Sequence, residues 1–121
     1  MLIRVYYEDT DAGGIVYHTN YIKYCERARS ELFFSRNLNP TDGDNSGFVV
    51  RHIDANFVGM ATLGDMLKVT TSLVKKKSAS VILKHIITND EKKVFEMEVT
   101  LVFVREGRPQ IIPDIFAEVL G

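Results

Sequence analysis

One segment with helical periodicity is followed only by segments with strand periodicity, and this order most constrains the fold. Between about residues 20 and 36, apolar side chains recur at i, i+4, i+7 and i+11 on one face of a helix. A short alternating stretch, 3–7, precedes this helix, and the period changes to two after residue 47. Four apolar, β-branched stretches then follow, at 48–57, 66–74, 80–88 and 95–103. The pattern predicts an α+β fold, in which an antiparallel sheet packs against a single helix.

Turn-forming residues separate these segments. Glycines at 13 and 14 end the first strand, and Thr19 or Asn20 is the expected N-cap of the helix. Residues 37–47, rich in Asn, Asp, Gly and Pro, are expected to form a loop. A hairpin loop is expected at 88–93 and a turn at 107–109, before a short tail.

Length and composition restrict the class of protein. The 121 residues are expected to form a single domain, 1–121, and the net charge of −1 gives no general attraction to nucleic acid. The basic run at 75–77 is expected at a solvated hairpin tip. A single cysteine excludes an internal disulfide, and no apolar run reaches membrane-spanning length. We therefore expect a soluble, cytoplasmic protein without a signal peptide.

Most of the chemically useful side chains lie in residues 6–31. Asp11 sits at a glycine turn just before the helix, where an ionised carboxylate can attack a carbonyl or deprotonate water. His18 would lie near the free backbone N–H groups of the helix start, and Tyr7 near the acidic cluster. An ordinary Asp-Gly turn, a core tyrosine and a capping histidine remain alternatives. The candidate catalytic residues are thus Asp11, His18 and Tyr7.

Other chemistries have little support. The two glycines lack the Lys-Ser/Thr of a phosphate-binding loop, and there is no Gly-x-Ser-x-Gly nucleophile elbow. His52 and His85 stand alone in predicted strands, so neither a metal site nor a cofactor is expected. Cys25 lies on the apolar stripe of the helix, which favours core packing over nucleophilic chemistry.

One helix hardly covers five strands, and apolar residues such as Val58, Met60, Val102 and Val104 leave further surface to bury. Sheet extension or face packing with a second copy would bury it, so we expect a homo-oligomer.

A specific resemblance supports these expectations. The stretch RVYYEDTDAGGIVYH at 4–18, continued by Asn20-Tyr21 and by Glu-Arg-Ala-Arg at 26–29, closely resembles the YbgC-type acyl-CoA thioesterases of the 4-hydroxybenzoyl-CoA thioesterase group. The resemblance implies a hot-dog fold, a curved antiparallel sheet wrapped around one long helix. It also implies that Asp11 is the catalytic carboxylate, assisted by His18 and Tyr7. Hydrolysis of an acyl-CoA thioester is the implied activity.

The resemblance further implies subunits that pair through their sheets, often as dimers of dimers, with active sites at the subunit interface. Relatives often accompany cell-envelope and phospholipid-synthesis proteins, which are therefore possible partners. The candidate substrate-binding positions are Tyr17, Gly14 and Asn20, with backbone N–H groups near Tyr17 and His18 holding the thioester oxygen. Segment 57–62 lacks the Pro and Arg that relatives tend to have there, and this departure leaves the CoA contacts unassigned.

Two rival functions remain open at this level. A hot-dog dehydratase would pair a histidine with a helix carboxylate, for which Glu26 or Glu31 is available. A non-catalytic acyl-CoA-binding or scaffold protein would not need the carboxylate at position 11. Positions lining the acyl pocket are guessed as Tyr24, Cys25, Phe48 and Met60.

Overall fold

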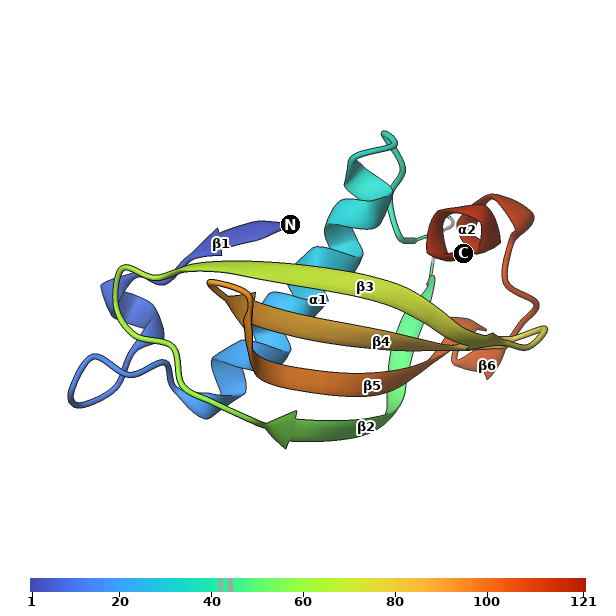
Figure 1. The fold of residues 1–121 in the computed structure, drawn as a ribbon. Helices are drawn as coiled ribbons and strands as arrows, with labels where there is room; N and C mark the ends of the chain where they lie inside the picture. The colour runs from blue at the N-terminus through green and yellow to red at the C-terminus, as the bar shows by residue number, and fades with distance from the viewer. Residues whose placement is uncertain (42, 44) are drawn as a thin grey trace.

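The computed structural model describes residues 1–41, 43 and 45–121, and the chain forms one sheet against one long helix (Figure 1). The elements follow in the order β1 (Leu2–Arg4), 3-10 helix η1 (Tyr7–Asp9), α1 (His18–Phe34), β2 (Ser46–Phe57), β3 (Met66–Lys76), β4 (Ser80–Asn89), β5 (Lys92–Arg105), β6 (Arg108–Pro109) and α2 (Asp114–Leu120).

The sheet is antiparallel, with strand order β1-β3-β4-β5-β2 and the short β6 paired to the end of β5. Its strands curve around α1, which crosses the inner face of the sheet (Figure 1). Register shifts at 50/52 in β2 and 73/75 in β3 mark irregularities of the kind that bend strands. The predicted α+β, hot-dog arrangement of about five strands around one helix is confirmed.

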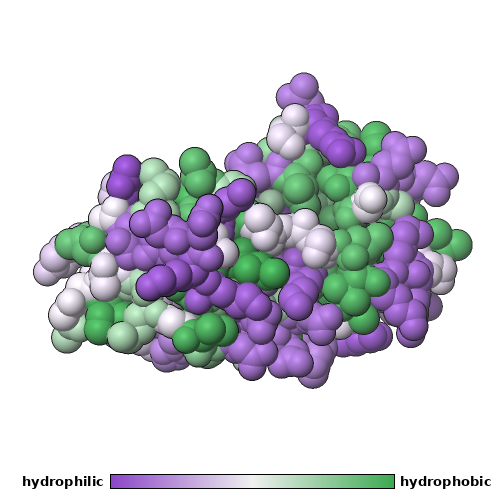
Figure 2. Space-filling view, viewed as in Figure 1, coloured by the Kyte–Doolittle hydropathy of each residue, from purple (hydrophilic) through white to green (hydrophobic). Residues whose placement is uncertain are grey.

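The outer face of the sheet is seen in Figure 2, where hydrophilic and hydrophobic side chains are mixed. The hydrophobic ones are most extensive toward the end where α2 lies. β1 and β2 are the two edges of the sheet, and β2 is by far the longer, with 12 residues against 3. A long edge strand offers a row of unpaired backbone groups to a second chain.

Helix α1 packs one stripe of side chains against the sheet and begins two residues earlier than predicted. Its N-cap is Tyr17, without a side-chain cap, so the expected caps Thr19 and Asn20 are wrong and both lie inside the first turn. The side chains that α1 buries are Tyr21, Tyr24, Cys25, Ala28, Arg29 and Phe33. Within the described residues, neither helix combines the length and hydropathy needed to cross a lipid bilayer.

The first strand is shorter than the alternation 3–7 predicts. It ends at Arg4, and Tyr7 opens the 3-10 helix with 81% of its surface exposed, rather than lying in a half-buried strand. The turn explains the difference, because the Tyr7 carbonyl accepts hydrogen bonds from the backbone N–H and the hydroxyl of Thr10.

A second helix, α2, forms where the sequence predicted only a tail. Its buried residues Phe116, Val119 and Leu120 are spaced i, i+3 and i+4, so this seven-residue helix has one apolar face. The ring of Phe116 packs against Phe33 of α1 at 5.3 Å, so α2 covers the end of the core. A helix this short depends on such tertiary contacts, and sequence periodicity alone does not reveal it.

The later strands run longer than predicted at their ends. β2 begins at Ser46, so the loop predicted at 37–47 is shorter, and its positions 42 and 44 lie outside the described residues. The loop between β4 and β5 narrows to Asp90 and Glu91, which both have positive φ, as a tight hairpin turn requires. Lys75 and Lys76 belong to β3, although they are exposed as expected of the hairpin end.

Candidate functional site

The turn that carries Asp11 is fixed by its own backbone. The N–H of Asp11 donates to the carbonyl of Ile15 at 3.0 Å, and the N–H of Gly14 donates to the carbonyl of Asp11 at 3.2 Å. Gly13 and Gly14 have φ of +89° and +74°, values that strain any residue with a Cβ. The turn leaves the Asp11 side chain exposed, and no hydrogen bond of its carboxylate is found within the described residues.

A second set of bonds fastens this turn to the start of α1. The backbone carbonyl of Asp9 accepts the N–H of Tyr17 at 3.0 Å and Nδ2 of Asn20 at 2.8 Å. The carboxylate of Asp9, only 7% exposed, accepts the N–H of Tyr6 at 2.9 Å. The N–H of Tyr17 is therefore occupied, and the first-turn N–H groups without an intrahelical acceptor begin at His18.

His18 is the first residue of α1 and its side chain is exposed. Its ring lies 4.5 Å from the ring of Tyr17 and 6.1 Å, edge-on, from that of Phe57 at the end of β2, centroid to centroid. The structure thus gathers Asp11, Tyr17 and His18, with Gly14 and Asn20, around one turn and one helix start. The Tyr7 hydroxyl has no hydrogen-bond partner among the described residues.

The segment after β2 packs beneath this turn. The N–H of Val16 donates to the carbonyl of Ala61 at 2.9 Å, and the N–H of Ala61 donates to the hydroxyl of Tyr21 at 3.0 Å. Ala61 is fully buried, whereas the neighbouring Val58 and Met60 are 55% and 68% exposed. The segment that lacks the Pro and Arg of relatives therefore supports the turn through its backbone.

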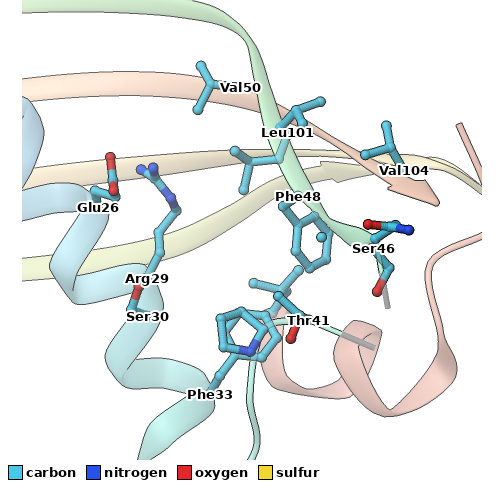
Figure 3. A pocket seen from close by; sticks show the side chains of 15 residues that line it. Glu26, Arg29, Ser30, Phe33, Thr41, Ser46, Phe48, Val50, Leu101 and Val104 are labelled. Carbon is cyan, nitrogen blue, oxygen red and sulfur yellow. The ribbon is translucent and has the colours of Figure 1, made fainter. Parts of the chain in front are cut away.

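A cavity lies elsewhere, between the second half of α1 and the first half of β2 (Figure 3). Its volume is about 530 Å³. Phe33, Phe48 and Leu101 supply apolar walls, and Glu26 and Arg29 supply charged ones. None of the predicted site residues lines it, and of the guessed pocket positions only Phe48 does. Glu26 lies eight positions after His18, which is about 12 Å along the helix.

Arg29 was not singled out as a functional residue by sequence reasoning, yet it faces this cavity with only 8% of its surface exposed. It donates from Nη1 to Nε2 of His85 at 3.2 Å, and Nδ1 of His85 lies 2.9 Å from Oγ1 of Thr71. Because arginine only donates, Nε2 is the acceptor and the imidazole is neutral, with its proton on Nδ1. Burial, and then the charge of Arg29, lower the pKa of His85 to about 3.

Two further titratable groups are buried on α1. Burial raises the pKa of the Cys25 thiol to about 12, so this side chain is a packed thiol and not a nucleophile at neutral pH, as expected. The hydroxyl of Tyr24 is buried without a hydrogen-bond partner in the described part of the chain, and burial together with the charge of Asp9 raises its pKa. No group of three or more potential metal ligands occurs among the described residues.

Comparisons with known proteins agree on one family. The family model of the thioesterase-like superfamily matches residues 5–120. The acyl-CoA thioesterase YbgC of Helicobacter pylori is 42% identical over an alignment of 132 positions, covering 100% of this chain and 98% of that protein. The acyl-CoA thioester hydrolase YbgC of Escherichia coli O6:H1 is 35% identical over 116 residues, covering 92% of this chain and 87% of that protein.

A solved structure shows the same fold. A probable thioesterase from Bartonella henselae superimposes with a TM-score of 0.86 and 30% identity, covering 93% of this chain and 97% of that one. The match therefore extends over nearly the whole of both chains, in sequence and in backbone. This chain belongs to the YbgC family of the thioesterase-like superfamily.

Proposed function

We propose that this protein hydrolyses the thioester of an acyl-CoA to a free acid and CoA, with Asp11 as its catalytic carboxylate. The observation that carries the proposal is the position of Asp11, exposed on a glycine turn just after Asp9, whose carbonyl is hydrogen-bonded to the start of α1. The printed activities of the YbgC relatives, acyl-CoA thioesterase and acyl-CoA thioester hydrolase, support the same reaction.

The chemistry follows from what lies around that carboxylate. Asp11 either attacks the thioester carbonyl, forming a mixed anhydride that water then hydrolyses, or removes a proton from the attacking water. In both routes the C–S bond breaks, the thiolate of CoA leaves, and one water is consumed. The thioester oxygen gains negative charge, and the N–H groups of His18 and Thr19 at the start of α1 are the available backbone donors.

Assembly through β2 would complete this site. β2 is a 12-residue edge strand, and four of its apolar side chains are more than a third exposed: Val49, Val50, Ile53 and Phe57. Two copies that pair their β2 strands antiparallel about a two-fold axis continue the sheet and bury this edge. The homo-oligomer expected from the sequence is therefore proposed as a dimer through β2.

This pairing would also bring the turn and the cavity together. Within one chain, Phe57 at the end of β2 contacts His18, while the start of β2 lines the cavity. Antiparallel pairing over most of β2 places the end of one strand beside the start of the other. The carboxylate of one subunit then faces the cavity of its partner, and that cavity receives the acyl group.

The test is complementation between two inactive variants. Asp11→Asn removes the carboxylate but keeps the cavity, whereas Ser30→Trp fills the cavity with bulk and keeps Asp11. Each purified variant alone should release no CoA thiol from acyl-CoA above background. After the two are unfolded together and refolded, random pairing of subunits should restore about a quarter of the parent's sites.

The outcomes separate the parts of the proposal. Parent-level turnover by Asp11→Asn would remove Asp11 from catalysis. An inactive mixture of two variants, each folded and dimeric by circular dichroism and sedimentation, would show that the site is not shared between subunits. The Asp11→Asn protein should keep the parent's melting temperature, because an exposed side chain without hydrogen bonds contributes little stability.

A further inference from the structure

Arg29 is a buried charge that forms no salt bridge in the described part of the chain, and the charge of Glu26 acts on it only from beyond salt-bridge distance. Its side chain makes one hydrogen bond in the described structure, to a neutral His85, and no carboxylate among the described residues lies within 4.0 Å of it. A guanidinium has five N–H donors, and the Arg29 nitrogens that do not bond to His85 stay accessible in the cavity that Arg29 lines, where they can donate to a bound group. Burying an ionised group in this way is costly unless a partner compensates for the lost water.

The surroundings hold the guanidinium in place. Thr71 of β3 orients the His85 ring from one side, and the ring accepts from Arg29 on the other. The donor is therefore anchored to the sheet as well as to α1. Figure 3 shows Arg29 and Glu26 side by side, both extending from α1 at one end of the cavity. The rest of the wall is largely apolar, from residues such as Phe33, Phe48 and Leu101.

This arrangement is poorly suited to a plain alkyl chain. A saturated chain that filled the cavity would displace water from Arg29 and offer it no acceptor. An oxygen at the far end of the acyl group would accept from the guanidinium, while its carbon chain packed on the apolar wall. Sites with a buried, preoriented donor discriminate strongly against analogues that lack the matching group.

We propose that Arg29 forms a polar subsite at one end of the cavity, which binds a distal oxygen of the acyl group, so that the preferred substrates are acyl-CoA thioesters oxygenated away from the thioester. This inference rests on the proposed function and names its substrate class. The oxygen belongs to a hydroxyl or to a carboxylate, and both accept from Arg29. Glu26 distinguishes the two, since its carboxylate accepts from a hydroxyl but repels another carboxylate.

The experiment compares matched substrates. Release of CoA thiol is measured for plain, ω-hydroxy and ω-carboxy acyl-CoA from butanoyl to octanoyl length, and kcat/KM is obtained for each. At one chain length or more, the parent protein should prefer an oxygenated substrate over its plain counterpart by about tenfold or more, as expected for a hydrogen bond to a charged group. Arg29→Gln should bring this ratio toward one.

Two variants provide the controls. Arg27 is exposed on the same helix and does not line the cavity, so Arg27→Gln should keep the parent's ratio. Glu26→Gln separates the two oxygen sources: it should raise the ratio for ω-carboxy substrates or lower it for ω-hydroxy ones. If both arginine variants lose the preference equally, the preference comes from the overall positive charge of this region and not from Arg29, and the subsite is overturned.

Failure of this inference is distinguishable from failure of the proposed function. If Asp11-dependent hydrolysis occurs but the parent shows no preference for oxygen at any length, the subsite is wrong and the thioesterase stands. If no acyl-CoA is hydrolysed in an Asp11-dependent way, the proposed function fails first. If Arg29→Gln does not fold, a parent ratio near one still overturns the subsite, and Glu26→Gln still tests whether the oxygen lies at the end of the cavity that Glu26 and Arg29 share.

Discussion

Nδ2 of Asn20 donates a hydrogen bond to the backbone carbonyl of Asp9 at 2.8 Å. The same oxygen accepts the N–H of Tyr17 at 3.0 Å, so both of its lone pairs are used. These two bonds join the residue before the glycine turn of Asp11 to the first turn of α1. Asn20 stays a candidate substrate-binding residue, and this bond also lets it link the chain just before Asp11 to the helix start at His18.

Replacing Asn20 by Ala should loosen this connection. We expect a loss of about 1 kcal/mol in the free energy of unfolding, because one hydrogen bond to a part-buried carbonyl is removed. kcat should fall while KM changes little, since the turn and the oxyanion donors lose their mutual alignment. Urea unfolding and steady-state kinetics measure the two effects. Lys23→Ala, an exposed change on the same helix, is the control.

His18→Ala should affect catalysis and leave stability nearly unchanged. The side chain is exposed and its position is the first residue of the helix, not the N-cap, so the capping role considered from the sequence is not available to it. We expect a melting temperature close to the parent's and a large fall in kcat, as for an interaction made mainly in the transition state. Normal turnover with a lowered melting temperature would assign His18 a structural role.

His85 should make the protein acid-sensitive. Its pKa is about 3 in the fold against an ordinary 6.5, so below pH 6.5 the unfolded chain binds a proton that the folded chain does not. This contribution to stability is complete above that pH and is lost as the pH falls toward the folded value. We expect a loss of about 1–2 kcal/mol between about pH 7 and pH 5.

The measurement for this prediction is urea unfolding at both pH values for the parent and for His85→Gln. Glutamine can still accept from Arg29 but does not titrate, so the variant should lose less stability on acidification. Comparing the two proteins cancels the carboxylates that titrate in both. An equal loss in parent and variant would show that His85 is not the group responsible.

Ile53→Asp should weaken the proposed dimer. Ile53 lies in the second half of edge strand β2 and is 37% exposed, and a two-fold interface repeats any new charge on both subunits. Sedimentation equilibrium should show a dissociation constant raised at least about tenfold. Leu2→Asp places the same charge on β1, the other edge of the sheet, and should leave association unchanged. The opposite pattern would move the interface to β1.

The sequence was most informative where structure is local. The period-two stretches and the helical stripe correctly indicated the strands and α1, because side-chain burial repeats along each element. The helix α1 begins two residues before the predicted start. The backbone carbonyl of Asp9, outside the helix, accepts the N–H of Tyr17 and so fixes where the helix begins. Tyr7 left the predicted strand for a similar reason, since its carbonyl is used by Thr10.

Local sequence patterns could not predict the cavity or the charged end of it where Arg29 lies. Arg29 and His85 stand 56 positions apart, and each has an ordinary place in its own element, on a helix stripe and in a strand. Only the sheet order brings β4 opposite α1 and makes them neighbours. Arg29 offered two signals in the sequence: its charge next to the apolar stripe of the helix, and its place in the Glu-Arg-Ala-Arg stretch at 26–29 that carries the family resemblance. The resemblance to a family pointed to Asp11 and His18, but it contained no information on the acyl pocket.

The long edge strand β2 has a consequence for how activity depends on the concentration of the protein. If each active site takes its carboxylate from one chain and its cavity from the other, a monomer contains no complete active site. Activity per chain would then vanish on dilution below the dissociation constant of the pair, although every chain stayed folded. Saturating acyl-CoA, bound between the two subunits, would favour the dimer and lower the protein concentration at which activity is lost, by mass action.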